Sequence, residues 1–345
     1  MLTTTVDPTI TGFRDLALQV RAAKLLDRRP AYYRAKVGST IAVFGGLWAA
    51  FVVVGNSWAT LGLAAAIGVI FTQLGFLGHD AGHQQVFSSR RANRVLGLVV
   101  GNALIGLCYG WWVPKHNAHH AHPNQRGHDP DIGDGLVPAQ SPGGEPRRRS
   151  LAWALARWQA PLFFPLMALR SAGLHVSGAR YLLGRHDRAA ILEALVVMAH
   201  GAAFFSLVFL VLSPLRALAF VAVQQVVFSC YLGCSFAPNH KGMPILAADT
   251  TMGFVRRQVT TSRNLSGGWL LTFLLGGLNF QIEHHLFPSM PRPNLRRAQG
   301  LVKEFCACCG LDYCEASVPQ SFGRILEHLG ARGRAAALAV GGLPS

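Results

Sequence analysis

The stretch that decides the fold runs from Val37 to Gly78 and reads VGSTIAVFGGLWAAFVVVGNSWATLGLAAAIGVIFTQLGFLG. It contains no Asp, Glu, Lys or Arg, and the sequence GNS at 55–57 interrupts it near the middle. An α-helix needs about 20 apolar residues to cross a bilayer, so this length fits two spanning helices joined by a tight turn. Buried helices of a soluble protein are the alternative, but core helices seldom run this long without a charge. We therefore predict a transmembrane hairpin.

A second charge-free region predicts a second hairpin. Residues 194–215 and 217–239 carry no charged side chain, and only Arg216 separates them. Ser213 and Pro214 stand just before this arginine and mark a turn. The four predicted spans cover residues of about 38–56, 58–77, 193–213 and 216–236.

The composition of the whole chain agrees with a membrane protein. Of the 345 residues, 51% are hydrophobic and 14% are charged, whereas soluble proteins carry about 25% charged residues. Lys and Arg number 32 against 16 Asp and Glu, which gives a net charge of +16. This excess alone fits nucleic acid, anionic lipid or an acidic protein partner. Disorder is excluded because the chain is apolar as well as basic.

The distribution of the basic residues predicts the orientation. They cluster before the first hairpin and between the two hairpins, whereas the loops inside the hairpins are nearly chargeless. By the positive-inside rule, the N-terminal segment 1–36, the segment 80–190 and everything after residue 240 are expected to be cytoplasmic. We expect no secretory signal in the N-terminal segment. The excess of positive charge is then explained by the orientation of the protein in the membrane and by a basic surface on which a partner docks. Nucleic acid is not expected as a partner.

Two further apolar segments, at about 95–113 and 265–281, are each just long enough to cross the membrane. If either crossed once, the histidine clusters on its two sides would face opposite compartments. We therefore expect both to be interfacial or re-entrant, with Trp111, Trp112 and Trp269 as aromatic residues of the interface.

Two remaining segments, 140–150 and 331–345, are expected to carry no chemistry. Residues 37–320 are predicted to form the main domain, and residues 321–345 a C-terminal tail whose Ala/Gly-rich part, 331–345, is frayed. The stretch at 140–150, with two prolines and three consecutive arginines, is predicted to be an exposed loop.

Eight of the 14 histidines gather in four short patches just outside the apolar runs. HDAGH at 79–83 and HNAHH at 116–120 space their histidines three or four residues apart, which places the rings on one face of a helix. QIEHH at 281–285 ends in two adjacent histidines, and APNHKG holds one just past the fourth span. Imidazole is the commonest ligand for redox-active first-row metals, so we predict a shared metal site. The candidate ligands are His79, His83, His116, His119, His120, His240, His284 and His285.

Eight imidazoles exceed the roughly four to six ligands of one ion, so two ions are predicted. Zinc normally takes three or four protein ligands with a water. A dinuclear, nearly all-nitrogen site suits iron, and copper stays open by ligand type alone. Asp80 and Glu283 lie inside the patches and are expected to accept hydrogen bonds from ring N–H groups, with direct ligation as the alternative. Six other histidines are expected to be isolated polar residues at the membrane edge: His122, His128, His175, His186, His200 and His328.

These patches resemble the histidine boxes of the membrane-bound fatty acid desaturases. HDAGH is similar to the first box, HNAHH to the second and QIEHH to the third, in which Gln281 replaces the first histidine. That replacement is typical of the front-end subgroup, which introduces a double bond between an existing one and the carboxyl end. The flanking sequences HPNQRGHDPDIG (122–133), FAPNHKGMP (236–244) and GGLNFQIEHHLFPSMPRPNL (276–295) are similar to the same subgroup.

With the two hairpins, the resemblance implies an all-α integral membrane protein whose cytoplasmic helical cap holds a dinuclear iron site. It implies that the seven box histidines are iron ligands and that His240 matches a further ligand. Coordination by Gln281 stays open, and Asn239 is expected to hold a water or to contact a ligand. The implied reaction uses O₂ and two electrons to introduce a cis double bond toward the carboxyl end of an acyl chain.

The resemblance also has departures that bear on partners. The haem motif HPGG of fused cytochrome b5 domains is absent, because the SPGG at 141–144 lacks the histidine. We therefore expect an external electron carrier of the ferredoxin or cytochrome b5 type with its reductase, and a fatty acyl lipid or acyl-CoA as substrate. The short, arginine-rich chain is more similar to a bacterial member, so a plasma membrane with both termini and the boxes cytoplasmic is expected.

Other functions stay open at this stage. A diiron hydroxylase or ketolase would use the same scaffold, and a metal transporter or sensor would use the histidines for binding alone. A transporter is expected to place its ligands at the bilayer midplane, whereas these patches lie at the ends of spans. Four cysteines near the C-terminus, Cys306, Cys308, Cys309 and Cys314, are expected to be reduced thiols, with a zinc or iron–sulfur site as the alternative.

Overall fold

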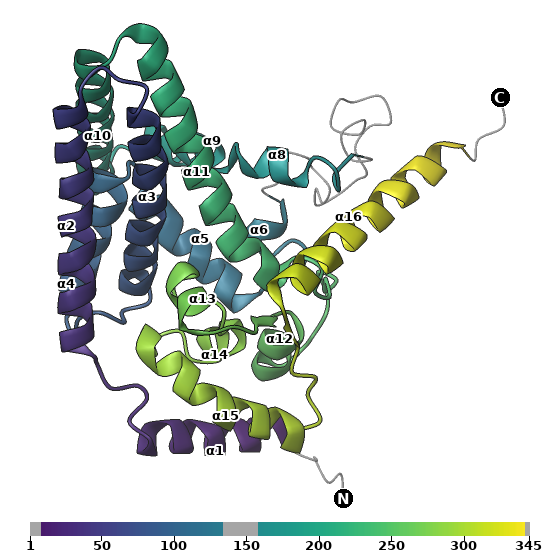
Figure 1. Ribbon diagram of the computed structural model, residues 1–345. Helices are drawn as coiled ribbons and strands as arrows, with labels where there is room; N and C mark the ends of the chain where they lie inside the picture. Colours follow the sequence, from purple (N-terminus) through teal and green to yellow (C-terminus); the bar gives the residue numbers. More distant parts are fainter. Residues whose placement is uncertain (1–7, 134–157, 342–345) are drawn as a thin grey trace, which may run out of the picture. The chain divides into compact units, whose positions relative to one another are not determined.

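The computed structural model describes residues 8–133 and 158–341, which are mostly helical (Figure 1). The loop predicted at 140–150 lies outside the described residues. The chain divides into two compact units, each made of segments that are far apart in the sequence. Unit 1 consists of Met1–Asp27, Lys115–Phe163 and Ser235–Ser345, and unit 2 of Arg28–Pro114 and Phe164–Cys234.

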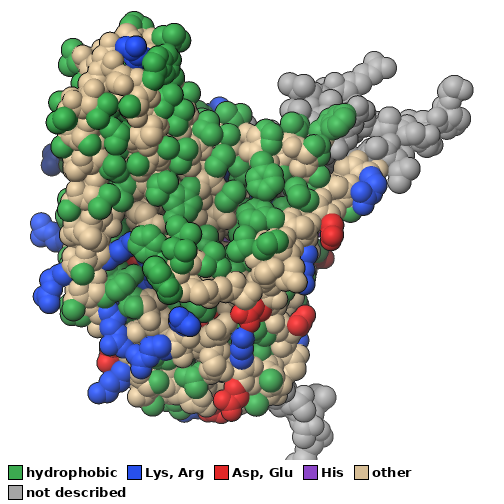
Figure 2. Space-filling model, viewed as in Figure 1, with side chains coloured by type: hydrophobic (Ala, Val, Ile, Leu, Met, Phe, Trp, Pro, Cys, Tyr) green, Lys and Arg blue, Asp and Glu red, His purple; other side chains and the backbone are tan. Residues whose placement is uncertain are grey.

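Unit 2 carries the helices that are long and apolar enough to cross a membrane, which confirms the two predicted hairpins. These helices are α2 (Pro30–Val54), α3 (Thr60–Gly82), α10 (Arg188–Val211) and α11 (Pro214–His240), of which residues 235–240 belong to unit 1. Hydrophobic side chains cover their outer faces (Figure 2), and Val53 and Leu210 are 86% and 84% exposed. Exposure of this kind is typical of side chains that face lipid.

The core of unit 2 is aromatic and tightly packed. Phe51 of α2 and Phe220 of α11 have ring centroids 4.7 Å apart, and Phe71 of α3 packs 5.6 Å from Phe228. Helices α3 and α11 approach closely at Gly68, where a Cβ atom would lie 2.8 Å from the carbonyl oxygen of Gln224. Small residues permit such close contact between membrane helices.

The predicted segment 95–113 is not one straight helix. It is divided among α4 (Arg90–Leu98), the π-helix η1 (Val99–Leu104) and the start of α5 (Tyr109–Ala121), and the helix direction turns by 118° at the break before α5. At this break Gly106 has φ of 72°, and a Cβ atom there would lie 2.5 Å from the ring of His200. The bend fits a broken or re-entrant segment, and its contact with lipid stays a prediction. Two further helices complete this part of the chain, α8 (Phe163–Met167) and α9 (Arg170–Leu183).

Unit 1 is a set of helices around one apolar core. Side chains of α1, α12, α14 and α15 form this core, with Leu16, Val259, Ile282 and Val302 buried in it. A short parallel pair of strands, β1 (Asn264–Leu265) and β2 (Glu315–Ala316), is the sheet of the described residues. The helices are α1 (Pro8–Ala22), α6 (Pro130–Gly133), α12 (Phe254–Thr260), α13 (Trp269–Leu274), α14 (Gln281–Leu286), α15 (Arg292–Cys308) and α16 (Val318–Gly341).

The predicted segment 265–281 is broken as well. Its helix α13 is only six residues long, and Gly276 and Gly277 then turn the chain with positive φ before α14. A helix of this length cannot cross a bilayer. Trp269 and Phe273 of α13 are exposed, so the interfacial position of this segment stays a prediction.

The C-terminal tail is helical as far as Gly341, so the prediction of a frayed segment at 331–345 is wrong for residues 331–341. Helix α16 continues to Gly341, and residues 342–345 lie outside the described part of the chain. The physical reason is the run of alanines, because alanine has the highest helix propensity of all residues.

We predict that Gly68→Ala lowers the unfolding midpoint of the detergent-solubilised protein. The added methyl group would meet the backbone of α11, and overpacking of this kind costs about 1–3 kcal/mol. Gly62→Ala on the same helix is the matched control, because a Cβ atom at Gly62 meets nothing within 4 Å. Equal midpoints for the two variants would contradict the close approach of α3 and α11.

Candidate metal centre

Three imidazole rings bring their Nε2 atoms together inside unit 1. His240 Nε2 lies 3.3 Å from His119 Nε2 and 3.1 Å from His285 Nε2. The rings come from α5, α11 and α14, so the fold gathers them from three distant parts of the sequence. We refer to His119, His240 and His285 as the histidine triad.

Each ring of the histidine triad is held from behind by a hydrogen-bond acceptor at its Nδ1 atom. The acceptors are the Asp129 carboxylate for His119 at 3.0 Å, the Thr261 carbonyl for His240 at 3.0 Å and the Gln258 Oε1 atom for His285 at 2.8 Å. Because an acceptor requires a donor, each Nδ1 carries a proton. In the neutral rings, the form that binds metal, the Nε2 lone pairs then face one another. Lone pairs in this arrangement repel unless a cation lies among them, and this is the usual build of a histidine metal site.

Three more histidines form a second group in unit 1. His116, His120 and His284 are buried and offer ligand atoms that lie within 4.8 Å of one another. The ring centroids of His120 and His284 are 4.8 Å apart. Gln258 donates its amide N–H to the His120 carbonyl at 2.9 Å, so the same side chain braces both groups.

The first histidine patch lies on α3 of unit 2. The rings of His79 and His83 have centroids 4.7 Å apart, as the predicted spacing on one helix face requires. Both side chains are buried. An Asp80 carboxylate oxygen lies 3.7 Å from His79 Nδ1, which is too long for a hydrogen bond, so the role expected for Asp80 stays a prediction.

Gln281 points at the histidine triad. Its Nε2 atom lies 2.9 Å from His240 Nε2, and its Oε1 atom accepts a hydrogen bond from Asn239 at 3.0 Å. The Asn239 Oδ1 atom is buried and has no hydrogen-bond partner among the described residues. A buried oxygen without a partner beside three facing imidazoles fits a metal site with a bound water or further ligand.

Glu283 does not bond a histidine ring, so the role expected for it is wrong. Its Oε1 atom accepts a hydrogen bond from Tyr313 at 2.7 Å and its Oε2 atom one from Asn264 at 2.7 Å. Burial raises the pKa of Glu283 above its ordinary value, and these two donors oppose that shift. Neighbouring residues on a helix point about 100° apart, so Glu283 ties α14 to the rest of unit 1 while His284 and His285 face the metal groups.

Sequence reasoning missed three groups that hold the histidine triad. Asp129, Gln258 and the Thr261 carbonyl have no place in the histidine patches, although Asp129 lies in the HDPD sequence that follows the second patch. Burial disfavours a charged His119, but the hydrogen bond and charge of Asp129 outweigh it and raise the pKa of His119.

The isolated histidines lie outside the metal groups of the described residues. Four of them have other partners: His122 bonds Gln125, and His128, His175 and His200 bond the carbonyls of Ala248, Gly106 and Ala103. His186 is exposed and His328 is half-buried.

The described fold is that of a helical membrane protein with buried histidine groups able to hold metal. Comparison with known proteins identifies its class, because residues 56–315 match the fatty acid desaturase family. The chain belongs to this family.

Named relatives agree with this assignment. The chain is 31% identical over 337 residues to an acyl-lipid (9-3)-desaturase of Physcomitrium patens, covering 94% of this chain and 63% of that protein. It is 34% identical over 317 residues to a Delta(5) fatty acid desaturase of Caenorhabditis elegans, covering 88% and 69%. A Delta(6)-fatty-acid desaturase of the same organism is 28% identical over 318 residues, covering 88% and 71%. The chain thus spans less than two thirds of the Physcomitrium patens protein.

We predict that Gln258→Leu weakens Fe(II) binding by about 10–100-fold, because it removes the acceptor that orients His285. Anaerobic titration of the purified protein measures this affinity. Gln299→Leu is the matched control, since Gln299 bonds Tyr313 and Glu315 instead of a histidine. An unchanged affinity in Gln258→Leu would show that His285 does not depend on this hydrogen bond.

The cysteines yield a prediction of reactivity. Cys306 is buried in the core of unit 1, and burial raises its pKa to about 12, whereas Cys308 is exposed. The thiolate is the reactive form, so at pH 8 iodoacetamide should modify Cys308 and leave Cys306 unmodified in the folded protein. Peptide mass spectrometry reads out both sites, and equal modification would contradict the burial of Cys306.

Proposed function

We propose that this protein is an oxygen-dependent fatty acyl desaturase that introduces a cis double bond toward the carboxyl end of an acyl chain. The observation that carries the proposal is the histidine triad, with three Nε2 lone pairs facing one another and Gln281 beside them. Family membership and the relatives named above, which are all desaturases, favour this function over a hydroxylase or ketolase.

We propose that the metal is iron and that two ions are held by the eight histidines of the patches. Within unit 1, one ion would be bound by His119, His240 and His285, and His116, His120 and His284 would be ligands of the other. The donor set fits iron because it is almost entirely imidazole, and the nearest carboxylate, Asp129, is already bonded to His119. Gln281 and Asn239 are proposed to contact a bound ligand or water beside His240.

When bound, iron would supply the oxidation in which O₂, two electrons and two protons convert two adjacent methylenes into a double bond and two waters. The protein's own residues hold the ligands for this chemistry. Asp129, Thr261 and Gln258 keep the triad protons on Nδ1, which leaves Nε2 as the donor atom of each ring. Burial of His119 and His285 keeps bulk water from these rings.

We propose that an external carrier of the ferredoxin or cytochrome b5 type, with its reductase, delivers the electrons to unit 1. Helices α1, α12 and α15 share the apolar core of this unit and present exposed arginines outward. Arg14, Arg256 and Arg297 are examples. A basic surface of this kind attracts acidic carriers, and anionic lipid is the other partner of suitable charge.

The four apolar helices make this an integral membrane protein. We propose that both termini and the histidine patches face the cytoplasm, on the basis of the positive residues outside the hairpins. The relatives named above come from eukaryotes, so the proposed bacterial plasma membrane is supported by the sequence alone.

The direct test is expression in a host supplied with a polyunsaturated fatty acid, followed by mass spectrometry of the fatty acid esters. A new double bond on the carboxyl side of the existing ones is expected. His83→Ala and His285→Ala should abolish the product, while His328→Ala, outside the metal groups, should retain it. Recovery of hydroxylated product alone, or near-normal activity of either patch variant, would refute the proposed reaction or the ligand assignment.

A further inference from the structure

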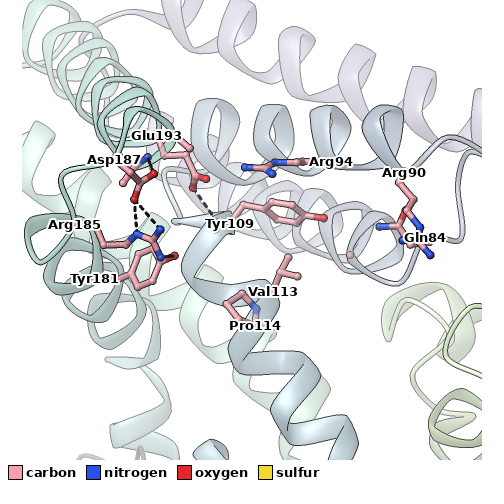
Figure 3. Close-up of a pocket in the computed structure, with 14 residues that line it drawn as sticks. Gln84, Arg90, Arg94, Tyr109, Val113, Pro114, Tyr181, Arg185, Asp187 and Glu193 are labelled. Carbon is pink, nitrogen blue, oxygen red and sulfur yellow. Dashed lines mark hydrogen bonds and ion pairs between the residues drawn. The ribbon is translucent and has the colours of Figure 1, made fainter.

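Unit 2 contains a pocket of about 350 Å³ that the proposed chemistry does not use (Figure 3). It lies where α3 ends, where α4, α5 and α10 begin, and where α9 ends. Its polar lining consists of Gln84, Arg90, Arg94, Tyr109, Arg185 and Glu193, together with Tyr181 and Asp187. Val113, Pro114, Ala189 and Ala190 add apolar surface.

The uncompensated charge of this pocket is positive. Arg90 and Arg94 stand four residues apart on α4, and both line the pocket. In Figure 3 the Arg94 guanidinium lies by the Tyr109 ring and the Arg90 guanidinium beside Gln84. Neither has a hydrogen-bond or ion-pair partner among the described residues. Arg185, in contrast, is paired with Asp187 at 2.7 Å, so its charge is already balanced.

The second carboxylate of the pocket is also engaged. Glu193 is buried in the first turns of α10, and its Oε2 atom accepts hydrogen bonds from the Gly110 N–H at 2.9 Å and from Asn102 at 3.2 Å. A Cβ atom at residue 110 would lie 2.4 Å from Glu193 Oε1, so this approach depends on glycine. Glu193 thus holds the start of α5, but its donors are neutral and leave its charge in place. Three arginines against two carboxylates leave the lining with one net positive charge for an anion.

The position of the pocket indicates an anion that belongs to a lipid. Span α3 ends at Gly82, and span α10 begins at Arg188. Residues at these two helix ends line the pocket. This is the level of phospholipid head groups at a membrane surface. Arginine pairs bind phosphate oxygens well, and the apolar lining suits the start of an acyl chain.

The size of the pocket favours a phospholipid over acyl-CoA. Its volume is at the small end of the range of roughly 300–1,000 Å³ for ligand pockets. A glycerophosphate group fits such a volume, whereas coenzyme A brings an adenosine and three phosphates. The one net positive charge of the lining also matches the single negative charge of a phosphodiester better than the several charges of coenzyme A.

We propose that this pocket binds the phosphodiester head group of the glycerophospholipid that carries the acyl substrate, with Arg90 and Arg94 as its anion ligands. The proposal rests on the desaturase function in taking the lipid as substrate, and it names the acyl carrier.

The pocket also adjoins the first histidine patch. Gly82 lines it and follows His79 on α3, and a Cβ atom at Gly82 would lie 2.9 Å from the Trp112 ring, whose centroid is 5.8 Å from that of His79. In a phospholipid only a few bonds separate the phosphorus from the ester carbonyl of the acyl chain. A head group bound here would fix the position of the carboxyl end of the acyl chain relative to His79 and His83. That position would determine at which carbon atoms, numbered from the carboxyl end, the double bond forms.

The test is a binding titration of the delipidated, full-length protein in detergent by native mass spectrometry. The probes are a phosphatidylcholine with a linoleoyl chain, linoleoyl-CoA and inorganic phosphate. The double variant Arg90→Gln/Arg94→Gln should bind the phosphatidylcholine about tenfold or more weakly, since charge-assisted hydrogen bonds are lost. Arg90→Lys/Arg94→Lys should recover part of the affinity. Arg91→Gln, an exposed neighbour on α4 outside the pocket lining, should bind like the parent.

Three results would overturn the proposal. The first is equal binding of phosphatidylcholine by the double variant and by Arg91→Gln. The second is a double variant that loses affinity for linoleoyl-CoA alone. The third is displacement of the lipid by inorganic phosphate at comparable concentration. An unchanged unfolding midpoint of the double variant shows that the fold is retained. The titration needs no iron, oxygen or electron donor, so its failure is distinguishable from failure of the desaturase proposal.

Discussion

The structure of unit 1 depends on holding imidazole lone pairs face to face in a protein interior. The Nε2 atoms of His119 and His285 lie 3.3 and 3.1 Å from that of the central His240. Their lone pairs repel one another until a cation lies among them, so each ring must be fixed from its other side. Asp129, Thr261 and Gln258 do this through the Nδ1 atoms. An orientation fixed before metal binding lowers the entropic cost of binding, and it makes the acceptors as important to the site as the ligands.

The rest of unit 1 supports the ends of the helices that carry these rings. Arg263 is fully buried and donates hydrogen bonds to the carbonyls of Pro238 and Lys241, which are left without helical partners at the end of α11, next to His240. Glu283 fixes α14 through Tyr313 and Asn264, and the apolar core holds α14 against α15. The Nη1 atom of Arg263 is buried without a hydrogen-bond partner among the described residues. A buried arginine and a buried glutamate are costly, so their presence beside the site shows how strongly ligand geometry constrains this unit.

Sequence alone predicted the features that local pattern encodes. The charge-free runs located the four long apolar helices of the described residues, and the spacing of HDAGH and HNAHH placed each set of rings on one helix face. The sequence did not predict that Gln258 and Thr261 accept hydrogen bonds from His285 and His240. These residues meet the rings only through the tertiary fold and belong to no motif of their own. Glu283 was misjudged for the same reason, since its partners Tyr313 and Asn264 are distant in sequence. The helical tail combines alanines, which favour a helix, with glycines, which favour fraying, so composition alone does not predict its helix.

The most direct test of the central claim is X-ray absorption at the iron edge of the full-length protein loaded with Fe(II). Ligation by the histidine groups predicts a first shell of nitrogen and oxygen, with the outer-shell scattering that imidazole rings produce. Sulfur in the first shell would place the iron at the cysteines instead. A first shell of oxygen alone, without imidazole scattering, would show that the facing histidines do not hold the metal.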